Sequence, residues 1–204
     1  MMLLEQLLET VDFAGAVDSL ASDFREKHGL GRIDQLGLVV PSVEDAAARL
    51  ETLGIGPFLI SSGAPVRWEE RGEPRRFKGK LGLARHNGVD LELLEPGEGS
   101  EFYRQYLDPG GGIVVQHLGF FIKQVDSRMQ RMNDSGIPTL IRGRIKTGPL
   151  AFDFAYMDSV GNAGFVIELI EFSAFGMRFR PPGVLYHFLG RLEKMSGLRC
   201  IDVG

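Results

Sequence analysis

The feature that most constrains the fold of this chain is an internal repeat. Residues 34–55 align without a gap on residues 116–137, and the two segments read DQLGLVVPSVEDAAARLETLGI and QHLGFFIKQVDSRMQRMNDSGI. Three identical pairs in this alignment are 82 positions apart: Gly37 and Gly119, Val43 and Val125, Gly54 and Gly136. A repeat of this kind predicts two copies of one supersecondary unit that share a core.

Each copy has the pattern of a βαβββ unit. A short apolar run typical of a strand is followed by a helix of about three turns that ends at a glycine. Ser42 with Asp45 resembles a capping box at the start of the first helix. Two more strand-like segments follow, and each copy closes on a strand that alternates apolar and acidic residues, DLELLE at 90–95 and FVIELIE at 165–171. The expected fold class is therefore α+β, with tandem βαβββ repeats forming a curved mixed sheet around a metal cleft.

The repeat also predicts the organisation of the chain. We expect an N-terminal helical segment, two modules joined by a linker, and a C-terminal extension, with the boundaries 1–31, 32–96, 97–113, 114–172 and 173–204. Within the linker, LDPGGG at 107–112 lacks the helix-opening spacing of a phosphate-binding loop, so we interpret it as a flexible crossover. The sequence does not indicate where the C-terminal extension lies.

Composition excludes several classes of protein. The chain has 204 residues, 44% of them hydrophobic, which is enough for a globular core. A net charge of -4 gives no reason to expect nucleic acid or an anionic membrane as partner. The single Cys200 excludes an intramolecular disulfide and a cysteine-rich zinc site. We expect a cytoplasmic protein, because no basic leader or run of roughly 18 apolar residues is present.

Four polar residues occupy equivalent positions in the two copies. Gln35 and His117 lie on the first strands, and Glu92 and Glu168 lie on the closing strands. If the copies pack by pseudo-twofold symmetry, these side chains face one another across a concave surface. Two carboxylates that face a core are costly to desolvate without a cation. One nitrogen and three oxygen donors suit a divalent ion such as zinc, nickel, cobalt or manganese.

The remaining candidates have simpler interpretations. Glu95 and Glu171 lie three residues beyond the candidate ligands, on the opposite face, and we interpret them as solvated strand ends. His28, His86 and His187 have no repeat partner and are expected to be structural or surface residues.

Two basic segments follow the second strand of their copies, RGEPRRFKGK at 71–80 and RGRIK at 142–146. Guanidinium groups bind carboxylates and phosphates, so these segments indicate an anionic substrate, although an ordinary solvated hairpin is the alternative. The candidate substrate-binding residues are Arg75, Arg76, Lys78, Arg142 and Arg144. Trp68 and Phe77 are either an apolar wall of the cleft or part of the core.

These motifs resemble the vicinal oxygen chelate superfamily. The resemblance covers about residues 32–172 and rests on LGLVVPSVEDA, LGIGPF, LELLEP, QHLGFFI and DSVGNAGFVIELIE, which are similar to the branch holding glyoxalase I and methylmalonyl-CoA epimerase. It implies metal ligands on the first and last strands of each copy, here Gln35, Glu92, His117 and Glu168. The ligand set is similar to that of eukaryotic-type glyoxalase I, whereas the sequences of the motifs are more similar to those of the epimerases.

The resemblance implies a metal-dependent isomerase or lyase that removes a proton next to a carbonyl or thioester through a metal-stabilised enediolate. We expect Glu168 to act as the base, with Glu92 on the other face. A coenzyme A thioester or a glutathione adduct would suit the basic segments. A ring-cleaving dioxygenase and a non-catalytic resistance-type binding protein are the alternatives. We also expect a homodimer that uses the segment 3–27 and the tail motifs FGMRF and VLYHFLG.

Overall fold

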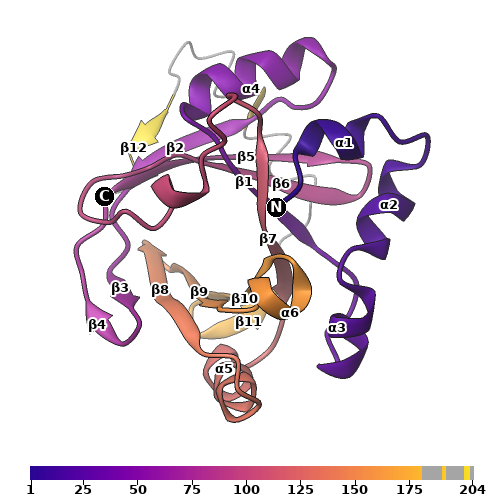
Figure 1. Cartoon of the computed structure of the whole chain (residues 1–204). Helices are drawn as coiled ribbons and strands as arrows, with labels where there is room; N and C mark the ends of the chain where they lie inside the picture. Colours follow the sequence, from indigo (N-terminus) through magenta and orange to yellow (C-terminus); the bar gives the residue numbers. More distant parts are fainter. Residues whose placement is uncertain (181–189, 192–199, 203–204) are drawn as a thin grey trace.

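The computed structural model describes residues 1–180, 190–191 and 200–202, and its centre is built equally from the two copies. Four neighbouring strands occupy the middle of one curved sheet, in the order β6 (Val89–Leu94), β1 (Gln35–Val39), β7 (Val114–Phe121) and β10 (Val166–Ala174). β1 runs antiparallel to β7, and each pairs in parallel with the closing strand of its own copy. The predicted curved mixed sheet is confirmed (Figure 1).

The register of these strands repeats the pseudo-twofold symmetry of the sequence. Gln35 pairs with Gly119, and the equivalent pair is Gly37 with His117. In the parallel pairs, Gly37 lies opposite Glu92 and Gly119 lies opposite Glu168. Because side chains alternate between the faces of a strand, equivalent residues of the two copies share one face of the sheet.

The outer strands complete the two βαβββ units. The first copy adds β2 (Leu59–Gly63) and β5 (Gly79–His86), and the second adds β8 (Thr139–Thr147) and β9 (Leu150–Met157). The helices α4 (Val43–Thr52) and α5 (Val125–Asp134) lie outside the two halves of the sheet, at the top and bottom of Figure 1.

A hairpin in the first copy joins the two modules at the far edge. It consists of β3 (Arg67–Glu70) and β4 (Glu73–Pro74), and β3 pairs antiparallel with β8 of the second copy. The sheet therefore curls back toward its own beginning and surrounds a concave face. At the opposite edge, β12 (Ile201–Asp202) pairs with β2, while β11 (Met177–Phe179) extends β10 as a short hairpin.

Both main helices receive a carboxylate at their N-termini. Glu95 Oε2 accepts a hydrogen bond from the Val43 N–H at 2.8 Å, and Glu171 Oε2 accepts one from the Val125 N–H at 3.0 Å. The interpretation of these glutamates as solvated strand ends is therefore wrong. They do point away from the candidate ligands, but a helix covers that face, and its free N–H groups need acceptors.

The N-terminal segment forms three short helices, α1 (Leu4–Leu8), α2 (Phe13–Ser19) and α3 (Ser22–Lys27). Their apolar residues, Leu4, Leu7, Phe13, Val17 and Phe24, are buried in the main core cluster. These apolar side chains are used within the chain, so they are not free for the subunit contact expected of this segment. In the tail, Phe175 and Met177 are exposed, whereas most of VLYHFLG lies outside the described residues.

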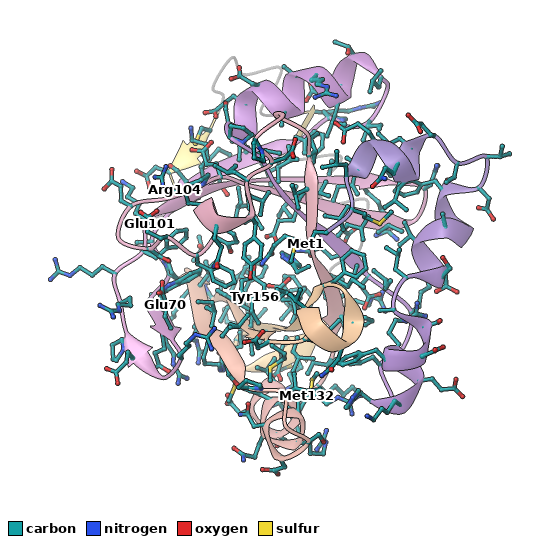
Figure 2. All side chains as sticks on the ribbon, in the orientation of Figure 1. Met1, Glu70, Glu101, Arg104, Met132 and Tyr156 are labelled. Carbon is teal, nitrogen blue, oxygen red and sulfur yellow. The ribbon has the colours of Figure 1, made fainter. Side chains whose placement is uncertain are left out.

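The concave face carries a second apolar cluster, which we call the concave cluster. Its buried members are Val39, Trp68, Leu94, Phe102, Tyr103, Leu140, Ile141, Phe154, Tyr156 and Val166. Phe102 and Tyr103 come from the linker, just before the 3-10 turn η1 (Arg104–Tyr106). Figure 2 shows Tyr156 between the two halves of the sheet, while Glu101 and Arg104 lie on the outside of the linker. The linker thus fills part of the concave face. Another short helix, α6 (Val160–Ala163), precedes β10.

No helix within the described ranges is long and apolar enough to cross a membrane.

Candidate metal centre

The structure brings all four predicted ligand residues together on the concave side of the central strands. His117 Nε2 lies 3.0 Å from Glu168 Oε2 and 3.4 Å from Glu92 Oε2. Gln35 Nε2 donates to Glu92 Oε2 at 2.8 Å. The ligating atoms of Glu92, His117 and Glu168 lie within 4.8 Å of one another, which is close enough to surround one ion.

Two glycines of the repeat make room for this convergence. A Cβ atom at Gly37 would lie 1.8 Å from Cε1 of His117, so the imidazole occupies the space of the missing side chain. A Cβ atom at Gly119 would lie 2.9 Å from Cβ of Gln35 and 3.4 Å from Glu168 Oε2. The close approach of the candidate ligand side chains accounts for the identical glycines at positions 37 and 119 of the repeat.

A β-bulge lies beside His117 in β7. The register of β1 and β7 shifts between Gly37 and Leu38, because Leu38 pairs with Val115 and leaves Gln116 as the extra residue. Gln116 Oε1 lies 2.7 Å from His117 Nδ1. We assign one proton to Nδ1 on this contact, since an amide oxygen can only accept, so Nε2 is the ring nitrogen that faces the two carboxylates. Such a partner on the second ring nitrogen is typical of metal-bound histidine.

The donor set fits a divalent cation. His117 is fully buried and Glu168 is 5% exposed. His117 Nε2 and Glu168 Oε2 are 3.0 Å apart, yet neither has a hydrogen-bond partner of acceptable geometry in the described part of the chain. Two buried, unpartnered polar atoms that converge on one point would both be satisfied by a cation placed there.

Gln35 fits less directly, because its amide nitrogen faces Glu92. It would coordinate through oxygen only with the amide turned over, an orientation assigned from neighbouring contacts. Its role as a fourth ligand remains a prediction.

In the metal-free protein, the two carboxylates favour a protonated His117 at the position where a cation would bind. Burial alone would lower the pKa of His117, but the carboxylates of Glu168 and Glu92 outweigh burial and raise it to about 9. Burial raises the pKa of Glu168, against the opposing effect of His117. A group that holds an excess proton at neutral pH exchanges it when a metal binds.

Two tyrosines beside the centre were missed by sequence reasoning. Tyr156 pairs in register with Glu168, and its ring centroid is 4.9 Å from that of His117. The hydroxyls of Tyr156 and Tyr103 are 3.0 Å apart. Burial raises the pKa of both tyrosines well above the usual value, so both hydroxyls carry protons that they can donate. Strand alternation counted back from Glu168 could have suggested Tyr156, but the linker has no periodicity that points to Tyr103.

The basic segment of the second copy does not form a free cationic surface. Arg142 is buried and pairs with Asp126 and Asp153, each at 2.9 Å, and it also donates to the Phe154 carbonyl. Arg144 lies 3.7 Å from Asp153. Arg142 therefore joins α5 to the β8–β9 hairpin, and the expectation that it binds substrate is not supported, because its donors are already occupied.

The basic segment of the first copy is different. Arg75, Arg76 and Lys78 line a pocket of about 580 Å³, and their side chains make no ion pair within the described residues. Trp68 and Phe77 also line it and stack with ring centroids 4.2 Å apart. Trp68 belongs to the concave cluster, as expected of a core residue, and it also walls this pocket, which none of the four candidate ligands lines.

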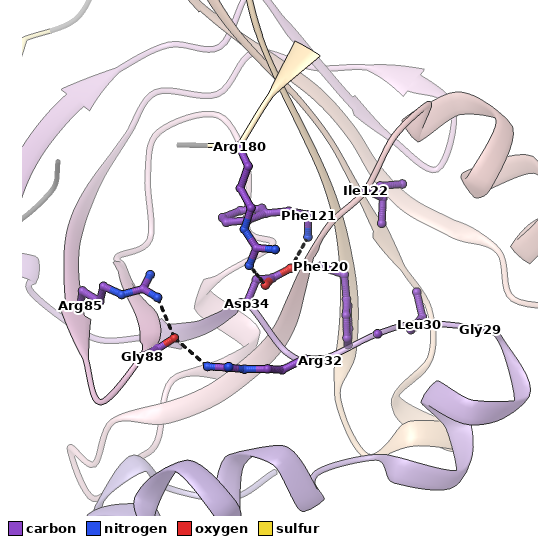
Figure 3. Close-up of a pocket in the computed structure, with 11 residues that line it drawn as sticks. Gly29, Leu30, Arg32, Asp34, Arg85, Gly88, Phe120, Phe121, Ile122 and Arg180 are labelled. Carbon is purple, nitrogen blue, oxygen red and sulfur yellow. Dashed lines mark hydrogen bonds and ion pairs between the residues drawn. The ribbon is translucent and has the colours of Figure 1, made fainter. Parts of the chain in front are cut away.

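A second pocket of about 300 Å³ lies at one end of the central strands (Figure 3), and none of the four candidate ligands lines it. Arg85 pairs with Asp90 at 2.5 Å and Arg180 pairs with Asp34. Arg32 and Arg85 both donate to the Gly88 carbonyl. Most of its charge is matched internally, which is typical of a structural ion network.

Comparison with known proteins identifies the family. Residues 34–156 match the profile of the Glyoxalase/Bleomycin resistance protein/Dioxygenase superfamily. The chain belongs to this superfamily. A search of curated protein sequences found no match. The superfamily, as its name says, holds enzymes and resistance proteins alike, so membership fixes the fold and leaves the activity to be argued from the site.

Several solved structures resemble this member of the superfamily. A hypothetical protein from Bacillus halodurans is 19% identical, with a TM-score of 0.45 over 68% of this chain and 92% of that one. Methylmalonyl-CoA epimerase from Mycobacterium tuberculosis is 17% identical, with a TM-score of 0.44 over 68% and 85%. A Streptomyces coelicolor methylmalonyl-CoA epimerase variant in complex with 2-nitronate-propionyl-CoA is 20% identical, with a TM-score of 0.42 over 69% and 96%. These values are too low to carry an argument about activity.

Proposed function

We propose that this protein is a metal-dependent isomerase or lyase of the glyoxalase or epimerase type, which removes a proton next to a carbonyl or thioester. The observation that carries the proposal is the pair of pseudo-equivalent carboxylates, Glu92 and Glu168, on either side of His117. A reaction that takes a proton from carbon and returns it needs a base on one face or on both.

Glu92, His117 and Glu168 would hold the metal, with Gln35 as the fourth residue. When bound, a divalent cation would polarise the substrate carbonyl and stabilise the negative charge that develops on its oxygen. Zinc, nickel, cobalt and manganese all accept this mixture of nitrogen and oxygen donors.

Glu168 is the proposed base. Its carboxylate is the more buried of the two, since its side chain is 6% exposed against 13% for Glu92. Burial raises the pKa of Glu168 toward the range in which a carboxylate takes up a proton from carbon most readily. Glu92 lies on the other side of His117, where it can take or return a proton on the opposite face of the substrate. Transfer between the two faces gives epimerisation, whereas return to an adjacent carbon on the same face gives glyoxalase-type isomerisation.

The proposed substrate is an anionic small molecule, with a coenzyme A thioester or a glutathione adduct as the leading candidates. Support comes from Arg75, Arg76 and Lys78 around the 580 Å³ pocket. Trp68 walls this pocket and its ring centroid is 6.2 Å from that of Tyr103, so one aromatic layer connects the pocket with the metal centre. We also propose that the protein acts in the cytoplasm as a homodimer.

Non-catalytic binding of a small molecule is the second candidate. It is favoured by the proton that His117 holds between two carboxylates, because that proton compensates the buried charge without any metal. A ring-cleaving dioxygenase is disfavoured, because it needs two histidines with one carboxylate, and the described group contains only His117.

Metal content and proton exchange test the proposal. Protein purified without chelator should hold about one divalent ion per chain and should exchange the α-proton of a branched acyl thioester or a hemithioacetal with deuterated solvent. Glu101→Gln is a matched control, because the Glu101 side chain is 77% exposed and, among the residues that the structure describes, forms an ion pair with Arg104 alone. A protein that binds neither metal nor exchangeable substrate, yet binds an anionic small molecule, would instead be a binding module.

A further inference from the structure

The two carboxylates of the centre have different neighbours in the adjacent strands. In the second copy, β9 places Tyr156 opposite Glu168. In the first copy, β5 places Leu83 at the equivalent position opposite Glu92. Leucine offers no hydrogen bond, so the pseudo-symmetry of the centre is broken beside the carboxylates themselves.

We propose that Tyr156, held in place by Tyr103 of the linker, is the positioning residue that orients Glu168 and makes it, rather than Glu92, the base of the reaction. The role of Glu168 as base rests on the proposed function, whereas the place of Tyr156 beside Glu168 follows from the strand register.

Tyr103, Tyr156 and Glu168 are placed so that a short chain of hydrogen bonds can end on the carboxylate. Tyr156 lies opposite Glu168 in the register of β9 and β10, and its hydroxyl is 3.0 Å from that of Tyr103. Both tyrosines are buried, 2% and 3% exposed, so solvent does not compete for these protons. Each hydroxyl has one proton to donate. Both are used when Tyr103 donates to Tyr156 and Tyr156 donates to Glu168.

The rings hold this chain in one orientation. Phe102 stacks on Tyr156 with ring centroids 5.4 Å apart at an interplanar angle of 11°. Tyr156 also packs against His117 and Phe154, at 4.9 and 5.6 Å between centroids. Because Phe102 and Tyr103 are consecutive residues of the linker, this connecting segment is a functional part of the site and not only a connection between modules.

Orientation has a chemical consequence for a base. A carboxylate removes a proton from carbon efficiently only when its oxygen is held in line with the scissile bond, and small misplacements cost large factors in rate. Glu168 lies opposite Tyr156, whose hydroxyl can donate to it. Glu92 contacts Gln35 and His117 but lies opposite Leu83, which offers no donor. Glu168 Oε2 lies 3.0 Å from His117 Nε2, so both atoms border the position that a cation would share.

The test uses Tyr156→Phe, which removes the hydroxyl and keeps the ring. Co²⁺ affinity, measured by competition with a chelating dye, should fall roughly 10-fold to 100-fold, as expected for a hydrogen bond to a charged group. Tyr103→Phe should weaken binding less, by roughly 3-fold, because Tyr156 still reaches Glu168. The matched control is Leu83→Met at the equivalent position, which should bind Co²⁺ like the parent. Unchanged affinity in Tyr156→Phe would overturn the inference.

A double-mutant cycle keeps the inference testable if the protein binds no metal. In metal-free protein, the effects of Tyr156→Phe and Glu168→Gln on urea unfolding should be coupled, whereas those of Tyr156→Phe and Glu92→Gln should add. Equal coupling in both cycles, or none in either, contradicts the orienting role. Absence of metal and of proton exchange in the parent, combined with selective coupling to Glu168, would remove the proposed function and leave the positioning contact standing.

Discussion

The two modules share one backbone plan and differ in what surrounds it. Equivalent residues occupy equivalent register positions across the central strands, as the pairs Gln35–Gly119 and Gly37–His117 show. Their polar partners are not equivalent. Only the second copy supplies an ionisable imidazole and a tyrosine beside its carboxylate. The repeat thus gives the candidate ligands a symmetric arrangement, while the residues around them differ between the two copies.

The largest difference between the two modules should appear when Glu168 and Glu92 are replaced by glutamine one at a time. Glu168→Gln should lose α-proton exchange by a factor of about 10² to 10⁴, because an amide can coordinate a metal but cannot accept the proton. Glu92→Gln should cost less. Solvent deuterium incorporation, followed by mass spectrometry on a substrate that the parent turns over, measures both. Near-normal exchange in Glu168→Gln would transfer the role of base to Glu92.

The repeat-related glycines should also differ in how much they matter. A Cβ atom at Gly37 would overlap the His117 ring, with three ring atoms at 1.8 to 2.1 Å. Gly37→Ala should therefore displace the imidazole, abolish metal binding and destabilise the protein by about 3 kcal/mol or more. The nearest atom at Gly119 is Cβ of Gln35, at 2.9 Å. Gly119→Ala should cost about 1 to 2 kcal/mol in urea unfolding, and a reversed order would contradict this account of the repeat.

The sequence could predict the frame because the frame follows from local rules. Strand alternation fixes which side chains share a face, and an ungapped repeat fixes which residues are equivalent. These two rules are enough to predict that Gln35, Glu92, His117 and Glu168 lie close together. The same alternation placed Glu95 and Glu171 on the opposite face correctly. It failed only for what covers that face, since helix docking depends on the whole fold.

Other features depend on contacts that no local pattern encodes. Arg142 has the sequence context of an exposed hairpin cation, but its partners come from α5 and β9. Tyr103 belongs to an irregular linker, and its place beside Tyr156 follows from how that linker crosses the concave face. The wrong expectation for Arg142 and the failure to find Tyr103 have one cause. Partners that are distant in sequence decide whether a polar side chain is free.

The pH dependence of metal binding should come from the titration of His117, which belongs to the second copy. The pKa of His117 is raised to about 9 in the metal-free protein, because Glu168 and Glu92 together outweigh the effect of burial. The imidazole is therefore protonated at pH 7 and must release its proton to bind a metal. Apparent affinity should rise about tenfold per pH unit up to pH 9 and then level off.

Calorimetric titration at pH 7 in buffers of different ionisation enthalpy should count about one proton released per ion. His117→Gln gives the second copy the residue that the first copy has at the equivalent position, Gln35. An amide side chain has no proton to lose when a metal binds. This variant should bind more weakly, and its affinity should depend much less on pH. A parent protein that releases no proton would contradict the assignment of His117 as the protonated ligand.

The smallest difference between the copies lies at the helix N-termini. α4 has two acceptors, because Ser42 accepts from the Asp45 N–H at 3.3 Å and Glu95 accepts from the Val43 N–H. α5 has no side-chain cap from its own N-cap residue, Gln124, whose φ is 61°. Only the Glu171 carboxylate receives its Val125 N–H, so the end of α5 depends on the closing strand of its module.

Glu171→Ala should therefore destabilise the protein by about 1 to 2 kcal/mol, and Glu95→Ala by about half as much, because Ser42 keeps part of the cap in the first copy. The midpoint of urea unfolding at constant slope measures both. Glu171 also pairs with Arg178, so Arg178→Gln is the control. That pair is exposed on the arginine side and should contribute little. Adding Ser42→Ala to Glu95→Ala should bring the first copy to the cost of Glu171→Ala. If Glu95→Ala alone costs more than Glu171→Ala, the caps do not account for how the helices are held to their strands.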